Sequence, residues 1–191
     1  MGRNKTWIRT DVLDKAMRLF WKKGYEGSHL GELVEVTGLN RFALYKEFGG
    51  KEGLYRDAMQ LYLAKLGDIS SPLQQEPYGW ANLEEYFNNV AGADFIHGCF
   101  FVNAMVEKKV IPPPVFADVT AFARGAMAAL KQNVEAAQKS GAINPDADPE
   151  TVTKFLFSFD IGFITSFITD HDKGSRRKVL DYLYSVLQHR A

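Results

Sequence analysis

The chain has 191 residues, with 23 basic side chains balanced by 23 acidic ones, so its overall charge says nothing about nucleic acid. That length suffices for a sizeable core in one domain or in two small ones. Cys99 is the only cysteine, which excludes an intrachain disulfide and favours a reducing, cytoplasmic location. The sequence has no apolar stretch near its N-terminus, so we do not expect a signal peptide.

The first predicted element is a helix that Thr10 caps and Gly24 ends, with an apolar stripe that includes Val12, Ala16 and Phe20. A short basic arm with Arg3 and Lys5 precedes it. The opening residues MGRNKT also match the loose N-myristoylation pattern, for which a basic arm is the simpler explanation.

Residues 28–48, SHLGELVEVTGLNRFALYKEF, are predicted to form two short helices joined by a tight turn. Ser28 is expected to cap the first helix, and Gly38 to end it in the left-handed conformation. Asn40 is expected to cap the second helix, which is too short to be stable alone. Its packing should come from Leu44 and Phe48.

The opposite face of this second helix is basic and aromatic, a combination typical of helices that enter the DNA major groove. The alternative is an ordinary corner between two helices, with solvated charges. Residues 1–60 hold 11 basic and 8 acidic side chains against 12 and 15 in the remainder, which favours DNA. The candidate DNA-binding residues are Arg3, Lys5, Ser28, His29, Asn40, Arg41, Phe42, Ala43, Tyr45, Lys46 and Lys51.

Within this set, Arg41 is the expected base reader, because its guanidinium can donate two parallel hydrogen bonds. Tyr45 and Lys46 are expected to reach phosphate, and Phe42 to contact a thymine methyl group. Lys51 opens the next helix, where it could hold a phosphate or simply be solvated.

The N-terminal third resembles the DNA-binding domain of the tetracycline-repressor (TetR) family of bacterial regulators. The run LYKEFGGKEGLY carries the most specific part of the resemblance, together with Gly24–Tyr25, Ser28 and Gly38–Leu39. Phe42 departs from the family, where a small residue or proline is usual, and this bears on the operator sequence rather than on the fold. The resemblance implies a homodimer, a palindromic double-stranded DNA operator and a cavity for a small-molecule effector.

Beyond Gly49–Gly50 the pattern is helical to the end, with a polar loop at residues 67–79, and no strand pair or repeat is evident. We therefore predict an all-α fold. A DNA-binding domain at 1–50 precedes a ligand-binding and dimerisation domain at 51–191, and a helix at 51–66 links the two. The later helices are expected at 81–91, 95–108, 115–140, 152–169 and 175–188.

The second domain holds a surplus of large apolar side chains with two polar residues, Asn103 and Asp160, inside apolar runs. Most of these apolar groups should simply fill the core, but a buried polar group needs a partner. We expect a flat or apolar effector to contact one of the two polar residues. The candidate ligand-binding residues are Phe100, Phe101, Asn103, Met105, Phe122, Met127, Phe155, Phe159 and Asp160.

The helix expected at 152–169 is not a membrane span, because Lys154 and Asp160 lie within it. Its two apolar stripes, with the apolar face of the last helix, exceed what one small bundle can cover. We therefore expect a four-helix dimer seam. The candidate seam residues are Phe163, Phe167, Val179, Leu183 and Leu187.

No catalytic constellation, metal-ligand spacing or phosphate loop stands out, so no enzyme activity and no cofactor are predicted. The predicted function is a ligand-responsive repressor that an apolar or aromatic effector releases from DNA. The helix at 51–66 would transmit the change, with Tyr62 packed on the second domain. The competing hypothesis is a helical ligand-binding or scaffold protein without specific DNA binding.

Overall fold

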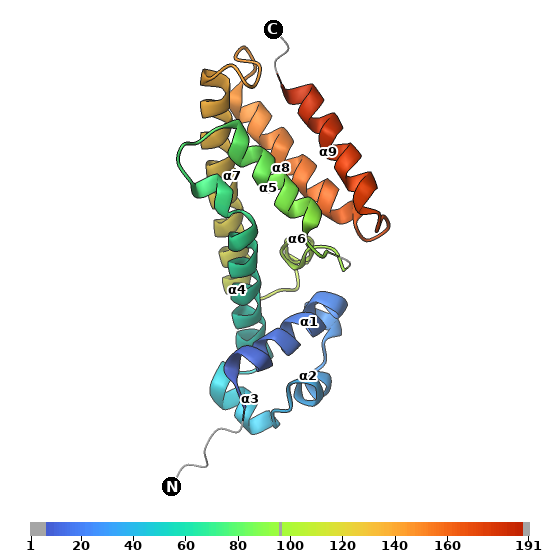
Figure 1. Ribbon diagram of the computed structural model, residues 1–191. Helices are drawn as coiled ribbons and strands as arrows, with labels where there is room; N and C mark the ends of the chain where they lie inside the picture. Colours follow the sequence, from blue (N-terminus) through green and yellow to red (C-terminus); the bar gives the residue numbers. More distant parts are fainter. Residues whose placement is uncertain (1–6, 96, 189–191) are drawn as a thin grey trace. The chain divides into compact units, whose positions relative to one another are not determined.

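The computed structural model describes residues 7–95 and 97–188, and all regular elements in these ranges are helical, which confirms the all-α fold (Figure 1). Their bounds are α1 Arg9–Gly27, α2 Leu30–Thr37, α3 Arg41–Phe48, α4 Lys51–Ile69, η1 Ser71–Gln74, α5 Trp80–Gly92, α6 Phe100–Val106, α7 Pro113–Lys139, α8 Pro149–Ser166 and α9 Lys173–Leu187. None of these helices is both long enough and apolar enough to cross a bilayer.

Packing divides the chain into two compact units. The first contains residues 1–65 and 99–120, and the second contains residues 66–98 and 121–191. The first unit thus adds most of α4, all of α6 and the start of α7 to the three N-terminal helices. The boundary at residue 50 between a DNA-binding domain and a ligand-binding and dimerisation domain stays a prediction.

Aromatic side chains form the core of the first unit. Tyr55 of α4 packs edge-on against Phe20 of α1, with ring centroids 4.8 Å apart, and against Phe100 of α6 at 5.4 Å. Tyr62, about two turns further along α4, also packs edge-on against Phe100, with ring centroids 5.6 Å apart. Edge-on pairs of this kind add to the apolar burial that holds the helices together. These four rings therefore fix α4 against α1 and α6 within this unit.

A sharp kink divides α1. Gly24 has φ 72°, a left-handed conformation that glycine adopts without steric cost, and the helix resumes to Gly27. The backbone N–H of Tyr25 donates to Glu107 Oε2 at 3.0 Å. A Cβ atom added at Gly24 would lie 2.1 Å from Glu107 Oε1. The positive φ therefore favours glycine at this position, and a larger residue would also displace the Glu107 carboxylate that accepts from Tyr25.

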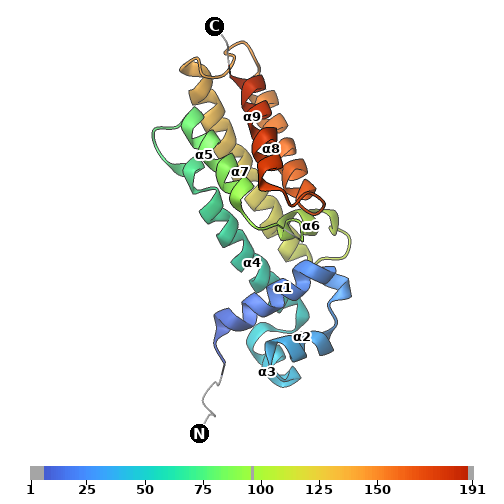
Figure 2. The ribbon, with the colours of Figure 1, turned by 45° about the vertical axis from the view of Figure 1, so that its right-hand side comes forward.

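In the second unit, α5, α8, α9 and the later part of α7 run alongside one another (Figures 1 and 2). Asn133 of α7 is buried and fixes the loop before α5: its Oδ1 accepts from Gly79 N–H at 3.0 Å, and its Nδ2 donates to the Leu73 carbonyl at 2.9 Å. The predicted helix at 95–108 is shorter than expected. It begins only at Phe100, because the chain turns through Gly98 at φ 74°.

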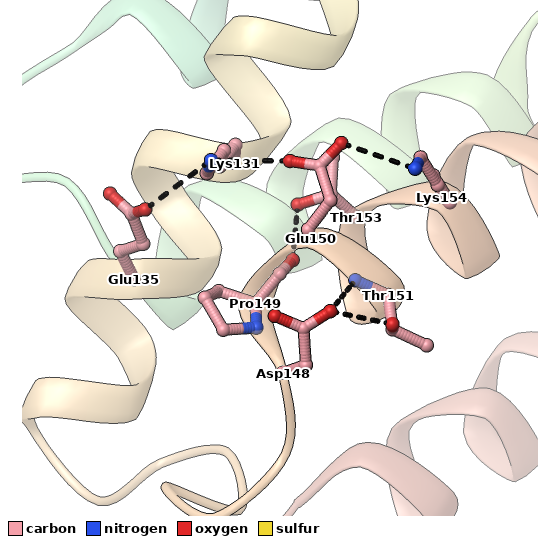
Figure 3. A network of polar contacts seen from close by, with 8 residues as sticks. All are labelled: Lys131, Glu135, Asp148, Pro149, Glu150, Thr151, Thr153 and Lys154. Atoms are coloured by element: carbon pink, nitrogen blue, oxygen red, sulfur yellow. Dashed lines mark hydrogen bonds and ion pairs between the residues drawn. The ribbon is translucent and has the colours of Figure 1, made fainter.

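Polar contacts tie the start of α8 to α7 (Figure 3). Asp148 caps α8 by accepting from Thr151 N–H at 2.9 Å. Glu150 lies 3.1 Å from Lys131 of α7 and 3.5 Å from Lys154 of α8. Each exposed ion pair contributes little by itself, so the cap is the stronger part of this network.

Candidate functional site

The turn between α2 and α3 has the expected geometry. Gly38 ends α2 with φ 72°, and its N–H donates to the Val34 carbonyl. Asn40 Oδ1 accepts from Ala43 N–H at 2.8 Å, which satisfies a free donor at the start of α3. Leu44 and Phe48 are buried, as predicted. A helix of eight residues is thereby held by caps and packing.

The outer face of α3 is basic and aromatic. Phe42 is 77% exposed and Tyr45 56% exposed, values unusual for large apolar rings. Arg41 and Lys46 are also exposed, and neither has an ion-pair partner among the described residues. Ala43 is partly buried at the side of this face, and Asn40 is exposed at its start. The structure therefore brings these predicted DNA-binding residues together on one short helix.

The expectation that Ser28 caps α2 is wrong. Its side chain is fully buried, and its hydroxyl donates to the Gly24 carbonyl at 2.8 Å. Ser28 therefore stabilises the kink of α1, and its side chain is not accessible to DNA. The N-cap of α2 is the exposed His29, whose N–H donates to Glu32 Oε2 at 3.3 Å. Arg3 and Lys5 lie outside the described residues.

Lys51 is partly buried beside α1 rather than freely solvated. Its Nζ lies 4.5 Å from the centroid of the Tyr25 ring and donates to the Glu26 carbonyl at 3.4 Å. Burial lowers the pKa of Lys51, and the nearby carboxylates of Glu26 and Glu107 oppose that shift. A phosphate contact by Lys51 remains a prediction.

The nine predicted ligand-binding residues fall in both compact units. Those of the first unit are Phe100, Phe101, Asn103 and Met105, and those of the second are Phe122, Met127, Phe155, Phe159 and Asp160. Phe155 is 47% exposed, so the expectation that it faces an internal pocket is wrong. The sequence shows that this helix position is apolar, but not whether its side chain faces the core of the unit or the surface.

Asp160 is the only carboxylate buried among the described residues. Its Oδ2 accepts from the Tyr86 hydroxyl of α5 at 2.9 Å, whereas Oδ1 has no hydrogen-bond partner there. Burial raises the pKa of Asp160 to about 7, and the Tyr86 hydrogen bond only partly opposes this. Sequence reasoning missed Tyr86, whose only signal is a hydroxyl within an apolar stripe.

A hollow of about 440 Å³ lies in the second unit between the end of α4, η1 and α7. Only Phe122 of the predicted pocket residues lines it. Its other walls are mainly small or polar: Gly67, Ser70, Leu73, Gln74, Gly125, Ala126, Ala128, Ala129 and Gln132. Sequence reasoning looked for bulky walls and so overlooked the small residues of α7.

The predicted dimer seam needs correction. Phe163, Phe167, Leu183 and Leu187 are buried in the second unit of a single chain, and only Val179 is exposed. The large apolar side chains that α9 does present are Val179, Tyr182 and Val186, at helical positions three and four apart. The buried stripe is the one that builds the unit's own core.

The described residues contain no group of three or more His, Cys, Asp or Glu side chains placed to hold a metal ion. Cys99 is buried and receives a hydrogen bond from the Tyr62 hydroxyl, with O and Sγ 3.3 Å apart. A buried thiol of this kind is usually inert.

Two family models match the chain: bacterial regulatory proteins of the tetR family at residues 12–58, and the tetracyclin repressor-like C-terminal domain at residues 80–183. The HTH-type transcriptional repressor ComR of Escherichia coli is 34% identical over 165 residues, which cover 81% of this chain and 77% of ComR. The repressor AcnR of Corynebacterium glutamicum is 24% identical, with 99% of this chain and 97% of AcnR covered.

Solved structures show the same fold. A cysteine mutant of the TetR family regulator CifR, complexed with 26-bp double-strand operator DNA, has a TM-score of 0.79 at 23% identity and covers 97% of this chain and 100% of its own. The reduced form of NemR from E. coli has a TM-score of 0.78 at 18% identity, with coverages of 96% and 98%. Together with the two models and the ComR match, this establishes that the chain belongs to the tetracycline-repressor family of bacterial regulatory proteins.

Proposed function

We propose that this protein is a homodimeric transcriptional repressor that binds a palindromic DNA operator through α3 and releases it when a small-molecule effector binds. The observation that carries the proposal is one face of α3, a helix capped by Asn40. The solvent-exposed side chains of this face are Arg41, Phe42, Tyr45 and Lys46. Family members are regulators, among them the repressors ComR and AcnR. No observation favours a scaffold without DNA binding.

The residues of α3 divide into base readers and phosphate contacts. Arg41 is the first residue of the helix, and the N-terminal residues of a recognition helix are those that contact base edges. Its guanidinium suits the O6 and N7 atoms of guanine. Lys46 and Tyr45 lie a turn further along, where their charge and hydroxyl can bind phosphate and fix the register.

Dimerisation would supply the second recognition helix. The exposed Val179, Tyr182 and Val186 of α9, with Phe155 of α8, offer the apolar surface that a second copy could bury. Two-fold symmetry then requires an operator whose half-sites lie about one helical turn, roughly 34 Å, apart. A single copy would read only one half-site.

Effector coupling is proposed to run through α4, one continuous helix from Lys51 to Ile69. Its first residues follow the recognition helix after Gly49–Gly50, and Tyr62 further along is buried against Phe100. A shift of α4 would move α3 and change the spacing of the two recognition helices. The effector must therefore prefer the DNA-free state, and DNA must weaken effector binding by the same factor.

The experiment that tests this function is selection of DNA by the purified protein from a random duplex library. A regulator of this class should enrich a palindromic sequence and bind it at least about 10³-fold more tightly than a scrambled duplex at physiological salt. Because the operator would lie on the bacterial chromosome, the cytoplasm is the proposed compartment of this protein. Enrichment of no sequence, or equal affinity for the scrambled duplex, would contradict the proposal.

A further inference from the structure

We propose that Asp160 and Tyr86 form the polar anchor of the effector site in the second unit, and that this anchor takes an organic cation with N–H donors, such as a primary ammonium or amidinium on an apolar body. The inference rests on the proposed function and narrows the effector to a chemical class. It concerns only the second compact unit, to which both residues belong.

The first argument is that Asp160 is incompletely satisfied. Thr153 and Asn133, the buried uncharged polar side chains of this unit, both have hydrogen-bond partners. The buried Arg176 donates to three backbone carbonyls, and only its Nε lacks a hydrogen-bond partner. Asp160, at 8% exposure, has one bond to one oxygen and a second oxygen with none. A buried carboxylate without a cation or a second donor is costly, so this oxygen is the natural partner of a ligand's N–H group.

The second argument is the aromatic surroundings of the pair. The Tyr86 ring lies 5.0 Å from Phe87, centroid to centroid, and Phe87 lies 5.7 Å from Phe159, the residue before Asp160. Phe159 in turn stacks on Phe163 at 5.3 Å. Aromatic faces attract cations through their quadrupole, most strongly where water is excluded. A carboxylate whose hydrogen-bond partner, Tyr86, belongs to this row of aromatic rings is thus suited to an ammonium group and poorly suited to an anion.

The same unit shows how such a cation is accommodated. The Arg176 guanidinium carbon lies 3.6 Å from the centroid of the Phe167 ring, and Phe167 packs edge-on against Phe163 at 4.8 Å. One end of this aromatic row therefore already carries a cation from the chain itself. At the other end, near Asp160, the described residues supply a carboxylate and no cation. A ligand would complete that end.

Calorimetry with two shape-matched probes tests the inference directly. 1-Naphthylmethylamine is a cation at pH 8, where Asp160 is mainly ionised, and 1-naphthalenemethanol has nearly the same shape but no charge. Benzylamine and benzyl alcohol provide a smaller pair. At least one amine should bind wild-type protein at least tenfold more tightly than its alcohol. If neither amine binds more tightly than its alcohol, the inference fails.

Asp160→Asn keeps the shape and the acceptor for Tyr86 while it removes the charge. It should weaken amine binding at least tenfold and leave alcohol binding unchanged, whereas Asp181→Asn on the exposed face of α9 should change neither. Carbon-13 NMR of the wild-type carboxyl gives a readout that needs no variant, because a bound cation must lower the pKa of Asp160. Amine binding that survives in Asp160→Asn, or an unmoved pKa, would overturn the inference.

Operator release is measured separately, so that the two proposals can fail independently. An amine that binds through Asp160 and also releases the selected operator supports both. An amine that binds through Asp160 without releasing the operator supports the site and refutes effector-driven release. Release by an amine whose affinity does not depend on Asp160 supports the regulator and refutes the site.

Discussion

Replacing Asp160 by asparagine should stabilise the protein at alkaline pH, although the variant removes a charged group from the proposed effector site. Burial raises the pKa of Asp160 to about 7 from an ordinary value of 3.8. Between these values the native state holds a proton that the unfolded state has released. The free energy of unfolding of the wild type therefore falls as pH rises from about 4 to 7, and levels off above 7.

The size of this effect follows from the same two values. At about 1.4 kcal/mol for each unit of pKa, the difference corresponds to about 4 kcal/mol, as an upper bound. Asparagine cannot ionise and still accepts from Tyr86, so the Asp160→Asn variant lacks this loss. Relative to wild type it should gain stability steadily between pH 4.5 and 7, and keep a gain on the order of 2–4 kcal/mol at pH 8.5.

Urea unfolding followed by circular dichroism measures this difference. Wild type and variant are compared at pH 4.5, 6 and 8.5 at one fixed protein concentration, because a dimer's stability depends on concentration. Asp181→Asn, which alters an exposed carboxylate, should track the wild type at every pH. A difference between wild type and Asp160→Asn that does not change with pH, or that shrinks as pH rises, would refute this account of the buried carboxylate.

Further predictions concern the surface, the kink and the recognition helix. Tyr182→Glu, at a 73% exposed position of α9, should give a folded monomer in light scattering, whereas Leu183→Glu, at a buried position, should unfold the chain. A dimer of Tyr182→Glu would contradict the proposed dimer surface on α9. Gly24→Ala should cost about 1 kcal/mol or more in urea unfolding, because a φ of 72° disfavours a residue with a Cβ atom, and a neutral result would contradict this reading. In the selected operator, uracil in place of the contacted thymine should weaken wild type but not Phe42→Ala, and equal weakening of both would exclude the methyl contact.

Local chemistry explains which parts of the fold could be predicted. The turn at Gly38 and the cap at Asn40 depend on residues within a few positions of one another, and both were predicted correctly. Ser28 was assigned the wrong role because two adjacent polar residues can each cap a helix. The helix begins at Phe100, five residues later than predicted, because the chain turns at Gly98, which has φ 74° and donates its N–H to the Phe95 carbonyl at 2.8 Å.

Longer-range features could be predicted only in part. An apolar stripe shows that a helix is buried, but not whether its own chain or a second copy covers it, and for this reason Leu183 was assigned to the dimer while Tyr182 was overlooked. Asp160 was singled out as a polar residue in an apolar run. Its partner Tyr86 lies 74 residues away, and no local pattern connects them.

The central claim, that α3 reads DNA sequence, is tested most directly by the ratio of specific to random DNA affinity in Arg41→Ala. Fluorescence anisotropy at fixed salt would compare the selected operator with a scrambled duplex. The control is Arg124→Ala, which removes an exposed arginine of α7 in the second unit. The account predicts that Arg41→Ala lowers operator affinity at least about tenfold more than random affinity, with Arg124→Ala unchanged. Equal losses on both duplexes would show that Arg41 only clamps phosphate, and no loss would show that α3 does not enter the groove.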